Sequence, residues 1–221
     1  MKARKLIINI SKEIGKVSAL LILPKDAHSL LVLSHGAGAG MQHTFMETLA
    51  QDLANQGVGT LRFNFAYMEK GAGPDRPPKA KAAIRAAVDK ALKYSEGLTL
   101  LAGGKSFGGR MTSHIAAEGG IPEVKGIVYF GFPLHAPGRQ GTERAAHLKD
   151  IKIPQLFLQG TRDALAQFDL IQGVVKRTRK AKLVKIEDGN HSFKTLKKSK
   201  LTHEEAIEKL AIETAKFAQK L

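Results

Sequence analysis

Residues 103–109 read GGKSFGG, a short stretch that fits two motifs with different chemistry. Its Gly-Lys-Ser is the end of a phosphate-binding P-loop, whose full pattern is G-x-x-x-x-G-K-[ST]. Residues 104–108 also fit G-x-S-x-G, a tight turn that presents a serine hydroxyl as a nucleophile. The elements on either side of the stretch decide between phosphate binding and nucleophilic attack.

The P-loop interpretation fails on spacing. Counting back from Gly104 places the first glycine of the pattern at position 99, which is Thr99. Residues 99–102 read TLLA and belong to an apolar strand pattern, where a phosphate-binding loop should lie. No predicted strand ends in an aspartate that could hold magnesium beside such a loop. The sequence therefore argues against a nucleoside triphosphate site.

The serine-turn interpretation has the context that it requires, which is a strand, a sharp turn and a helix. Residues 98–102 predict a buried strand and residues 107–118 predict a helix, with Ser106 on the turn between them. Gly104 and Gly108 would relieve crowding where the chain reverses. A serine at this place could also be a simple helix N-cap, so the rest of the chain must supply its partners.

A serine nucleophile needs a base, and the base needs a group that orients it. His191 lies in DGNHSFK, directly after the last predicted strand, and Asp163 lies in GTRDALA, directly after the strand before it. The order serine, acid, histidine is the order expected for this motif, with the last two on loops after later strands. We therefore predict a triad of Ser106, Asp163 and His191.

Three other acidic residues are rivals to Asp163. Asp169 falls in a helix pattern, and Glu187 and Asp188 lie too near His191 in sequence to reach behind its ring. Asp163 is preferred on these grounds.

A glycine-rich loop, SHGAGAG (34–40), follows the predicted strand 30–33. A loop at this place supplies one backbone donor to the anionic intermediate of acyl transfer. We predict the N–H groups of Ala37 and Phe107 as that oxyanion hole. A dinucleotide loop, G-x-G-x-x-G, is disfavoured because Met41 stands where the third glycine would fall.

Strand and helix patterns alternate along most of the chain, which predicts an α/β fold with a mostly parallel, doubly wound sheet and helices on both faces. The predicted strands number about eight: 5–10, 17–23, 30–33, 59–65, 98–102, 125–132, 153–160 and 182–187. The first two have no helix between them and should form a hairpin at one edge. Helices are predicted from 44 to Gly57, from 80 to near Gly97, over 107–118, over 166–177 and from 202 onward, with capping-box spacing at 44–47 and 202–205. Without an interdomain linker, residues 1–221 should form one domain.

Several segments together resemble the small, lidless α/β hydrolases of the dienelactone-hydrolase-like group. The resemblance is carried by LSHGAGAG (33–40), LRFNFAYMEKG with PDRPP (61–78), GGKSFGGRM (103–111), FGFPLHAPG (130–138), LFLQGTRDALA (156–166) and GNHSFK (189–194). The nearest likeness is to bacterial members of the branch that includes the testis-expressed and NSL-complex hydrolase-like proteins. It implies an α/β-hydrolase fold without a large lid, with Ser106 as nucleophile, Asp163 as acid and His191 as base. Dienelactone hydrolases proper use cysteine, and this chain has none.

These residues predict a serine hydrolase that acts on small carboxylic esters, thioesters or lactones through an acyl-enzyme intermediate. No cofactor or metal is expected: His203-Glu204 begins like H-E-x-x-H, but the pattern ends in Ile207. The alternative is a non-catalytic scaffold of the same fold that binds a protein or nucleic-acid partner.

The formal net charge of +15 is unusual, and residues 176–200 carry ten Lys or Arg against two acidic residues. We interpret this charge as a solvated surface, and nucleic-acid binding is not expected because no aromatic-interleaved basic motif accompanies it. Lys194, Lys197, Lys198 and Lys200 follow His191 closely, so an anionic substrate is a further hypothesis. No apolar run is long enough for a membrane span or a signal peptide, and the absence of cysteine suits a reducing compartment, so a cytoplasmic location is expected.

Overall fold

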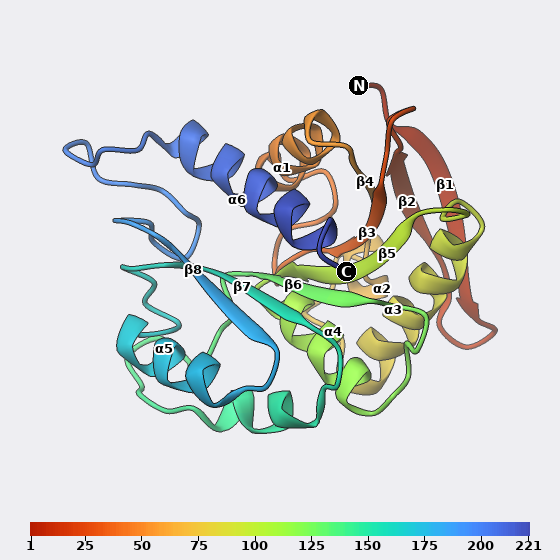
Figure 1. Ribbon diagram of the computed structural model, residues 1–221. Helices are drawn as coiled ribbons and strands as arrows, with labels where there is room; N and C mark the ends of the chain where they lie inside the picture. Colours follow the sequence, from red (N-terminus) through yellow and green to blue (C-terminus); the bar gives the residue numbers. More distant parts are fainter.

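The protein folds around one twisted sheet of eight strands (Figure 1). The structure is a computed structural model that describes residues 1–221. The strands are β1 (Arg4–Ser11), β2 (Gly15–Ile22), β3 (Ser29–Ser34), β4 (Val58–Phe63), β5 (Thr99–Lys105), β6 (Gly126–Phe130), β7 (Gln155–Gly160) and β8 (Ala181–Ile186). Their order across the sheet is β1-β2-β4-β3-β5-β6-β7-β8.

The sheet is parallel from β4 to β8 and antiparallel at one edge. The β1–β2 hairpin is antiparallel, and β2 joins β4 in antiparallel register with Ala19 opposite Phe63. In the middle, β3 lies between β4 and β5, with Ser34 opposite Phe63 on one side and Gly104 on the other. The predicted parallel sheet, its strand count and the edge hairpin are therefore confirmed. The carboxyl ends of β3, β5, β6, β7 and β8 meet along one edge, where open α/β sheets carry their sites.

Helices cover both faces of the sheet (Figure 1). On one face, α1 (Thr44–Asn55) and α6 (His203–Ala218) share a core with apolar side chains of the central strands. On the other face pack α3 (Pro77–Leu92), α4 (Phe107–Ala117) and α5 (Phe168–Arg177), together with a 3₁₀ segment η1 (Glu143–Asp150). Consecutive side chains of a buried strand point to opposite faces of the sheet. The near-continuous apolar strands therefore contribute side chains to the cores on both faces.

Of the two predicted capping boxes at helix N-termini, one is confirmed and the other is wrong. Thr202 caps α6 with a full capping box, in which its hydroxyl accepts from the Glu205 N–H and the Glu205 carboxylate accepts from the Thr202 N–H. The capping box predicted at 44–47 does not form. The N-cap of α1 is His43, whose ring accepts a hydrogen bond from the Phe45 N–H. A histidine ring nitrogen can take the role of the serine or aspartate oxygen, which the residue pattern did not consider.

Other differences from the predicted elements concern boundaries and short helices. β5 runs three residues beyond the predicted strand, to Lys105, so the turn is confined to one residue. The short helix α2 (Ala66–Glu69) and η1 were not predicted. Both are too brief to show a periodic apolar face. η1 lies in the longest connection of the second half of the chain, between β6 and β7, and no lid domain is inserted there.

No helix is both long enough and apolar enough to cross a membrane.

Candidate active site

Ser106 occupies a strained turn between β5 and α4. Its backbone has φ 48° and ψ −111°, which is left-handed for a residue with a side chain. Such a conformation costs on the order of 1–3 kcal/mol and persists only where the surroundings enforce it. Here the Ser106 N–H donates to the Phe130 carbonyl at 3.2 Å, and its own carbonyl accepts from the Arg110 N–H at 3.0 Å. The turn is thus fixed by β6 on one side and by the first turn of α4 on the other.

Two glycines let this turn press against the end of β3. A Cβ atom on Gly104 would collide with the Ser34 carbonyl oxygen. A Cβ atom on Gly108 would lie 2.5 Å from the His35 carbonyl oxygen and 2.7 Å from the Ser34 Cβ. The glycines of G-x-S-x-G are therefore required by contact between the turn and the loop that follows β3.

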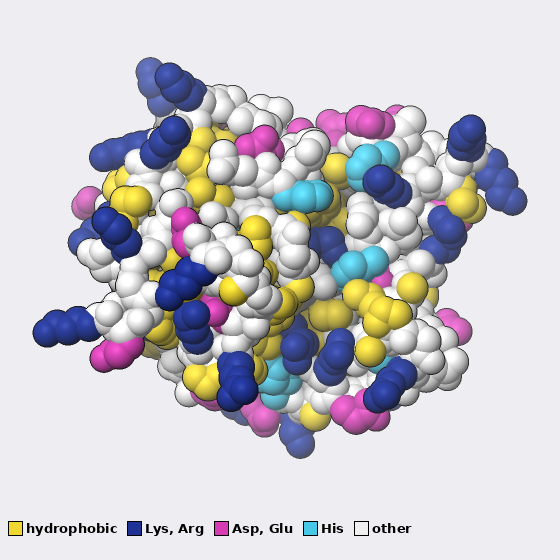
Figure 2. Space-filling view, turned by 180° about the vertical axis from the view of Figure 1, so that it is seen from behind, with side chains coloured by type: hydrophobic (Ala, Val, Ile, Leu, Met, Phe, Trp, Pro, Cys, Tyr) yellow, Lys and Arg dark blue, Asp and Glu magenta, His cyan; other side chains and the backbone are white.

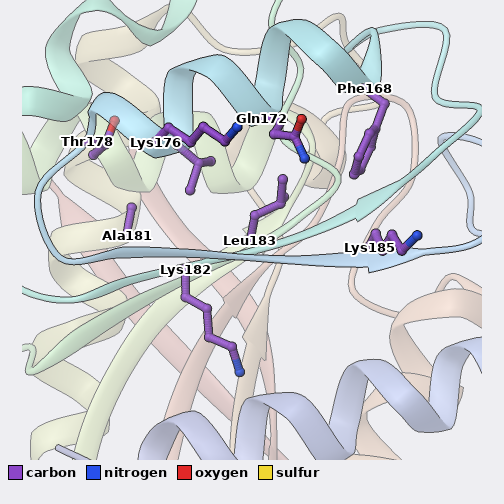
Figure 3. Close-up of a pocket in the computed structure, with 9 residues that line it drawn as sticks. Phe168, Gln172, Lys176, Thr178, Ala181, Lys182, Leu183 and Lys185 are labelled. Atoms are coloured by element: carbon purple, nitrogen blue, oxygen red, sulfur yellow. The ribbon is translucent and has the colours of Figure 1, made fainter.

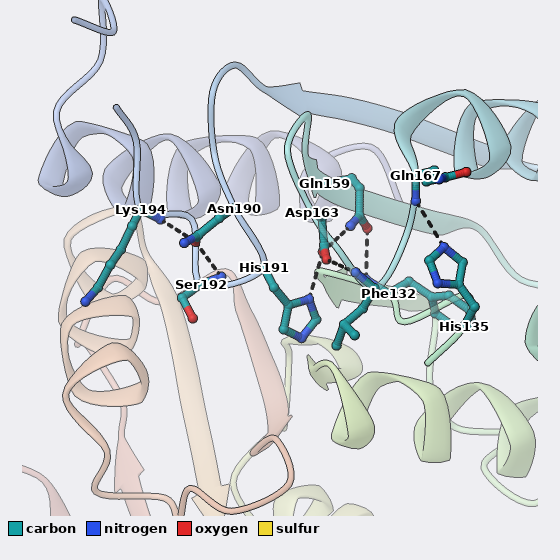
Figure 4. Close-up of polar contacts among 10 residues, drawn as sticks. Phe132, His135, Gln159, Asp163, Gln167, Asn190, His191, Ser192 and Lys194 are labelled. Carbon is teal, nitrogen blue, oxygen red and sulfur yellow. Dashed lines mark hydrogen bonds and ion pairs between the residues drawn. The ribbon is translucent and has the colours of Figure 1, made fainter. Parts of the chain in front are cut away.

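A histidine–aspartate pair stands at the ends of β7 and β8 (Figure 4). The His191 Nδ1 lies 2.8 Å from the Asp163 Oδ2. The Asp163 side chain is fully buried, whereas the His191 side chain is 24% exposed. Because an ionised carboxylate can only accept, Nδ1 carries the proton of a neutral ring and Nε2 keeps its lone pair. The pair therefore presents a base toward solvent with a buried acid behind it.

The Asp163 carboxylate is held by two further donors, one of which the sequence analysis missed. The Leu165 N–H donates to Oδ1 at 2.8 Å, and the Gln159 side-chain amide donates to Oδ2. The other end of the Gln159 amide accepts from the Phe132 N–H at 2.9 Å (Figure 4). A buried glutamine at the end of a predicted apolar strand was the available signal, since such a side chain needs partners.

Ser106 and His191 line one cavity, with a volume of about 310 Å³. Gly36 and Ala37 form part of its wall, and Leu165 closes another side. No hydrogen bond joins the side chains of Ser106 and His191, and catalytic contacts of this kind are often loose before substrate binds. The structure thus brings together every residue of the predicted triad, with Asp163 directly behind the His191 ring.

The loop after β3 is fixed by a buried histidine. The His35 Nδ1 lies 2.7 Å from the Gly36 carbonyl, and its Nε2 accepts from the Phe65 N–H at 3.0 Å. Burial lowers the pKa of His35, so the ring stays neutral and makes both bonds. The Tyr67 hydroxyl donates to the same Gly36 carbonyl at 3.2 Å. His35 therefore orients the next backbone N–H groups and does not ligate or react.

The two predicted oxyanion donors lie on either side of Ser106. The Ala37 N–H has no hydrogen-bond partner and borders the cavity. Phe107 is the first residue of α4, so its N–H has no partner inside the helix and lies at the end of the helix that favours negative charge. A Cβ on Gly36 would lie 3.9 Å from the Ser106 Cβ, which shows how closely the loop approaches the serine.

The cavity opens beside a second cleft between α1 and α6. His43, Phe45 and Ser192 border both spaces. The second cleft has a volume of about 470 Å³, and most of the residues that line it are polar, including Lys194 and His203. A substrate bound at Ser106 could therefore extend a polar group over Phe45 toward Lys194.

A larger groove elsewhere lacks this chemistry. It lies between α5 and β8, and Figure 3 shows its lining of Phe168, Gln172, Lys176, Thr178, Ala181, Lys182, Leu183 and Lys185. Its volume is about 490 Å³, but it contains no nucleophile beside a base. No group of three or more His, Asp or Glu side chains in the protein is arranged to hold a metal ion.

A second serine–histidine contact provides an instructive contrast. The Ser113 hydroxyl lies 2.7 Å from both the Arg110 carbonyl and the His147 Nε2. A carbonyl can only accept, so the serine proton points to it and the His147 ring donates to the serine. Ser113 is fully buried and does not line the cavity that contains Ser106 and His191. This pair is structural.

Comparison with known proteins identifies the family and the fold. Residues 27–219 match the family described as "Alpha/beta hydrolase domain", and the chain belongs to that family. Three solved structures share its fold. They are a dienelactone hydrolase from Anabaena variabilis (TM-score 0.76, 18% identity, 100% of this chain and 99% of that one), Est1E from Butyrivibrio proteoclasticus (0.73, 19%, 98% and 98%) and an α/β serine hydrolase without a lid from Xanthomonas campestris (0.68, 19%, 100% and 93%). The chain is thus an α/β hydrolase by family and has the same fold as these solved structures.

Proposed function

We propose that this protein is a serine hydrolase that cleaves small carboxylic esters, thioesters or lactones. The observation that carries the proposal is the hydrogen-bonded pair of buried Asp163 and partly exposed His191, which lines the same cavity as Ser106 on its strained turn. A serine nucleophile, a histidine base with a free ring nitrogen and an acid that orients the ring form the constellation for acyl transfer, and backbone strain often marks such sites.

The proposed reaction has two steps. The Ser106 Oγ attacks the acyl carbonyl while His191 Nε2 takes its proton, and Asp163 stabilises the resulting imidazolium. The tetrahedral intermediate collapses when His191 returns the proton to the leaving group. The proton goes to the oxygen of an alcohol or to the sulfur of a thiol. Water then attacks the acyl-serine with the same base, which releases the acid and restores the serine.

The N–H groups of Ala37 and Phe107 are the proposed donors to the intermediate's oxyanion. Both are unpaired, and both flank Ser106. Loss of one such donor typically lowers kcat by about 100-fold or more. Neither step calls for a metal or an organic cofactor.

An anionic substrate is a second part of the proposal. Lys194 lines the cleft next to the cavity, and the chain carries a large positive charge. A carboxylate at the far end of the substrate would then gain from Lys194. Comparing kcat/KM for matched neutral and carboxylate-bearing esters tests this, and equal rates or a preference for the neutral ester would refute it.

The alternative function is a non-catalytic scaffold that binds a partner. On the face shown in Figure 2, Lys and Arg side chains are spread among acidic and apolar ones and form no single stripe. Nucleic-acid binding through counterion release is favoured by a continuous basic track, so this face gives the alternative little support.

Labelling with a fluorophosphonate probe tests the catalytic proposal, with the modified peptide mapped by mass spectrometry. We expect labelling of Ser106 that is lost in Ser106→Ala and in His191→Ala. Ser113→Ala is the matched control, because Ser113 also contacts a histidine but lies outside the cavity, and it should label like the wild type. A folded wild type that does not label would refute the proposal and favour the scaffold.

A further inference from the structure

Lys105 is an unusual residue because its charged end is buried without a partner. It is the last residue of β5 and precedes Ser106 directly. The residue contributes to the cavity lining, and its Cγ packs 3.5 Å from the position of a Cβ on Gly36. Its Nζ, however, is turned away from solvent and makes no hydrogen bond. It is the only lysine of the chain in this state.

The Nζ occupies a small space behind the His191–Asp163 pair. A Cβ on Gly131 would lie 3.2 Å from the Nζ, 3.5 Å from the His191 carbonyl oxygen and 3.6 Å from the Asp163 Oδ2. Gly131 has φ 72°, so its backbone also suits glycine alone. The ends of β6, β7 and β8 thus enclose the ammonium group together with the triad acid.

The groups that face Lys105 can be named from each side. Asp163, after β7, is the charged group that acts on it, and His191, after β8, is the titratable neighbour. From the same loop as His191, the Phe193 ring lies with its centroid 5.6 Å from the Nζ, close enough for a cation–π contact. The Gly131 side carries no charge.

This arrangement is costly if the lysine only fills space. Burial lowers the pKa of Lys105 to about 8, and the Asp163 charge opposes that shift only in part. A methionine of similar shape would avoid the desolvation penalty altogether. We therefore ask what the positive charge of Lys105 does to the neighbouring Asp163–His191 pair.

We propose that Lys105 is a positioning residue. Its buried ammonium group attracts the Asp163 carboxylate electrostatically and opposes protonation of the His191 ring. The consequence is that His191 stays ready to accept the Ser106 proton down to a lower pH than it would without the lysine. The catalytic part of this inference rests on the proposed function, but its electrostatic part concerns the Asp163–His191 pair alone.

The size of the effect follows from distance. Lys105 Nζ and Asp163 Oδ2 form no direct ion pair, and their positions around Gly131 place them at most about 7 Å apart. With an effective dielectric constant of about 20, one charge at this range shifts a titration midpoint by about one to two pH units.

The experiment follows the His191 ring by NMR during a pH titration, with Lys105→Met, Lys105→Arg and wild type compared and His191→Gln used for assignment. We expect the midpoint of ring protonation to rise by about one to two units in Lys105→Met and to stay near the wild-type value in Lys105→Arg. Lys197→Met is the matched control, since Lys197 is exposed and outside the cavity, so its removal should change the midpoint by much less. An unchanged midpoint in folded Lys105→Met would overturn the inference.

A second readout covers the case in which Lys105→Met does not fold. In the wild type, the His191 signals should show a further inflection near pH 8, where Lys105 loses its proton, and this inflection should vanish in Lys105→Arg. Its persistence in Lys105→Arg, or its absence from the wild type, would also overturn the inference.

Ester hydrolysis separates the two proposals. If the protein hydrolyses esters, the acid limb of kcat/KM should move with the NMR midpoint in Lys105→Met. If the midpoint moves but no ester is hydrolysed and no probe reacts, the proposed function fails and the electrostatic role of Lys105 stands.

Discussion

Replacing Gly108 by alanine tests whether the serine turn is built against the loop that supplies the oxyanion donor. Gly108 is the second residue of α4, and its Cα faces the end of β3. The new Cβ would lie 2.5 Å from the His35 carbonyl oxygen, and 2.7 Å from both the Cβ and the carbonyl oxygen of Ser34. None of these atoms is the end of a flexible side chain, so the clash can be relieved only by moving α4 or β3.

Two opposing effects determine how much Gly108→Ala changes the free energy of unfolding. Alanine is favoured over glycine inside a helix by about 1 kcal/mol. Overpacking costs about 1–3 kcal/mol, and the upper end applies here because β3 is paired on both sides and cannot shift freely. We expect a net loss of about 2 kcal/mol, which for a chain of this size lowers Tm by about 4–8 °C. Any shift of the β3 end also moves Gly36 and Ala37, so kcat should fall by at least about tenfold.

Thermal denaturation and ester hydrolysis measure the two effects. Gly73→Ala is the control, because Gly73 is not in the left-handed region and a Cβ there would meet no atom within 4 Å. Its Tm and kcat should match those of the wild type. A Gly108→Ala protein as stable as the wild type, or more stable, and fully active would refute the argument that contact with β3 requires glycine here.

Three further predictions concern other contacts. Gln159→Leu should lower kcat about 10–100-fold with little change in KM, because it removes a buried donor to the Asp163 carboxylate; an unchanged kcat would contradict that role. Thr202→Ala should lower stability by about 1 kcal/mol in urea denaturation without affecting kcat, since it removes the α6 cap, and no loss of stability would show that the cap contributes nothing. Burial, with a smaller contribution from the neighbouring His114, lowers the pKa of His147 to about 4, so the unfolded chain binds more protons than the native state between about pH 6.5 and 4. Stability should therefore be fully present above pH 6.5 and fall as the pH drops through this window, by on the order of 1–2 kcal/mol after solvent screening, and His147→Gln should flatten the curve; equal slopes would count against it.

Most of the candidate site residues could be predicted from the sequence. The strand–turn–helix context of Ser106 could be predicted because G-x-S-x-G specifies a backbone geometry. The glycines that this geometry requires can be read directly from the sequence. The loops of Asp163 and His191 could be placed because each directly follows a predicted strand. The cap at Thr202 was readable for the same reason, since it depends on residues only three positions apart.

The features that were missed are a helix cap made by an unexpected residue type, a short helical segment and a contact between residues far apart along the chain. His43 caps α1 in place of the predicted capping box at 44–47, and η1 has too few residues for a period to appear. Gln159 looked like part of a strand, and its link from Asp163 to Phe132 exists only because β6 and β7 end side by side.

The sequence by itself determined the βα alternation, the strained serine turn and the order of the three polar residues, because these are written in neighbouring residues and in periodicity. The tertiary structure decided which polar atoms meet. Only the packing of β6, β7 and β8 places the Lys105 ammonium near the Asp163 carboxylate with no acceptor of its own. Only the contact of Gly104 and Gly108 with β3 explains why those glycines cannot be larger. Distances between strand ends follow from the register of the whole sheet, which no local pattern specifies.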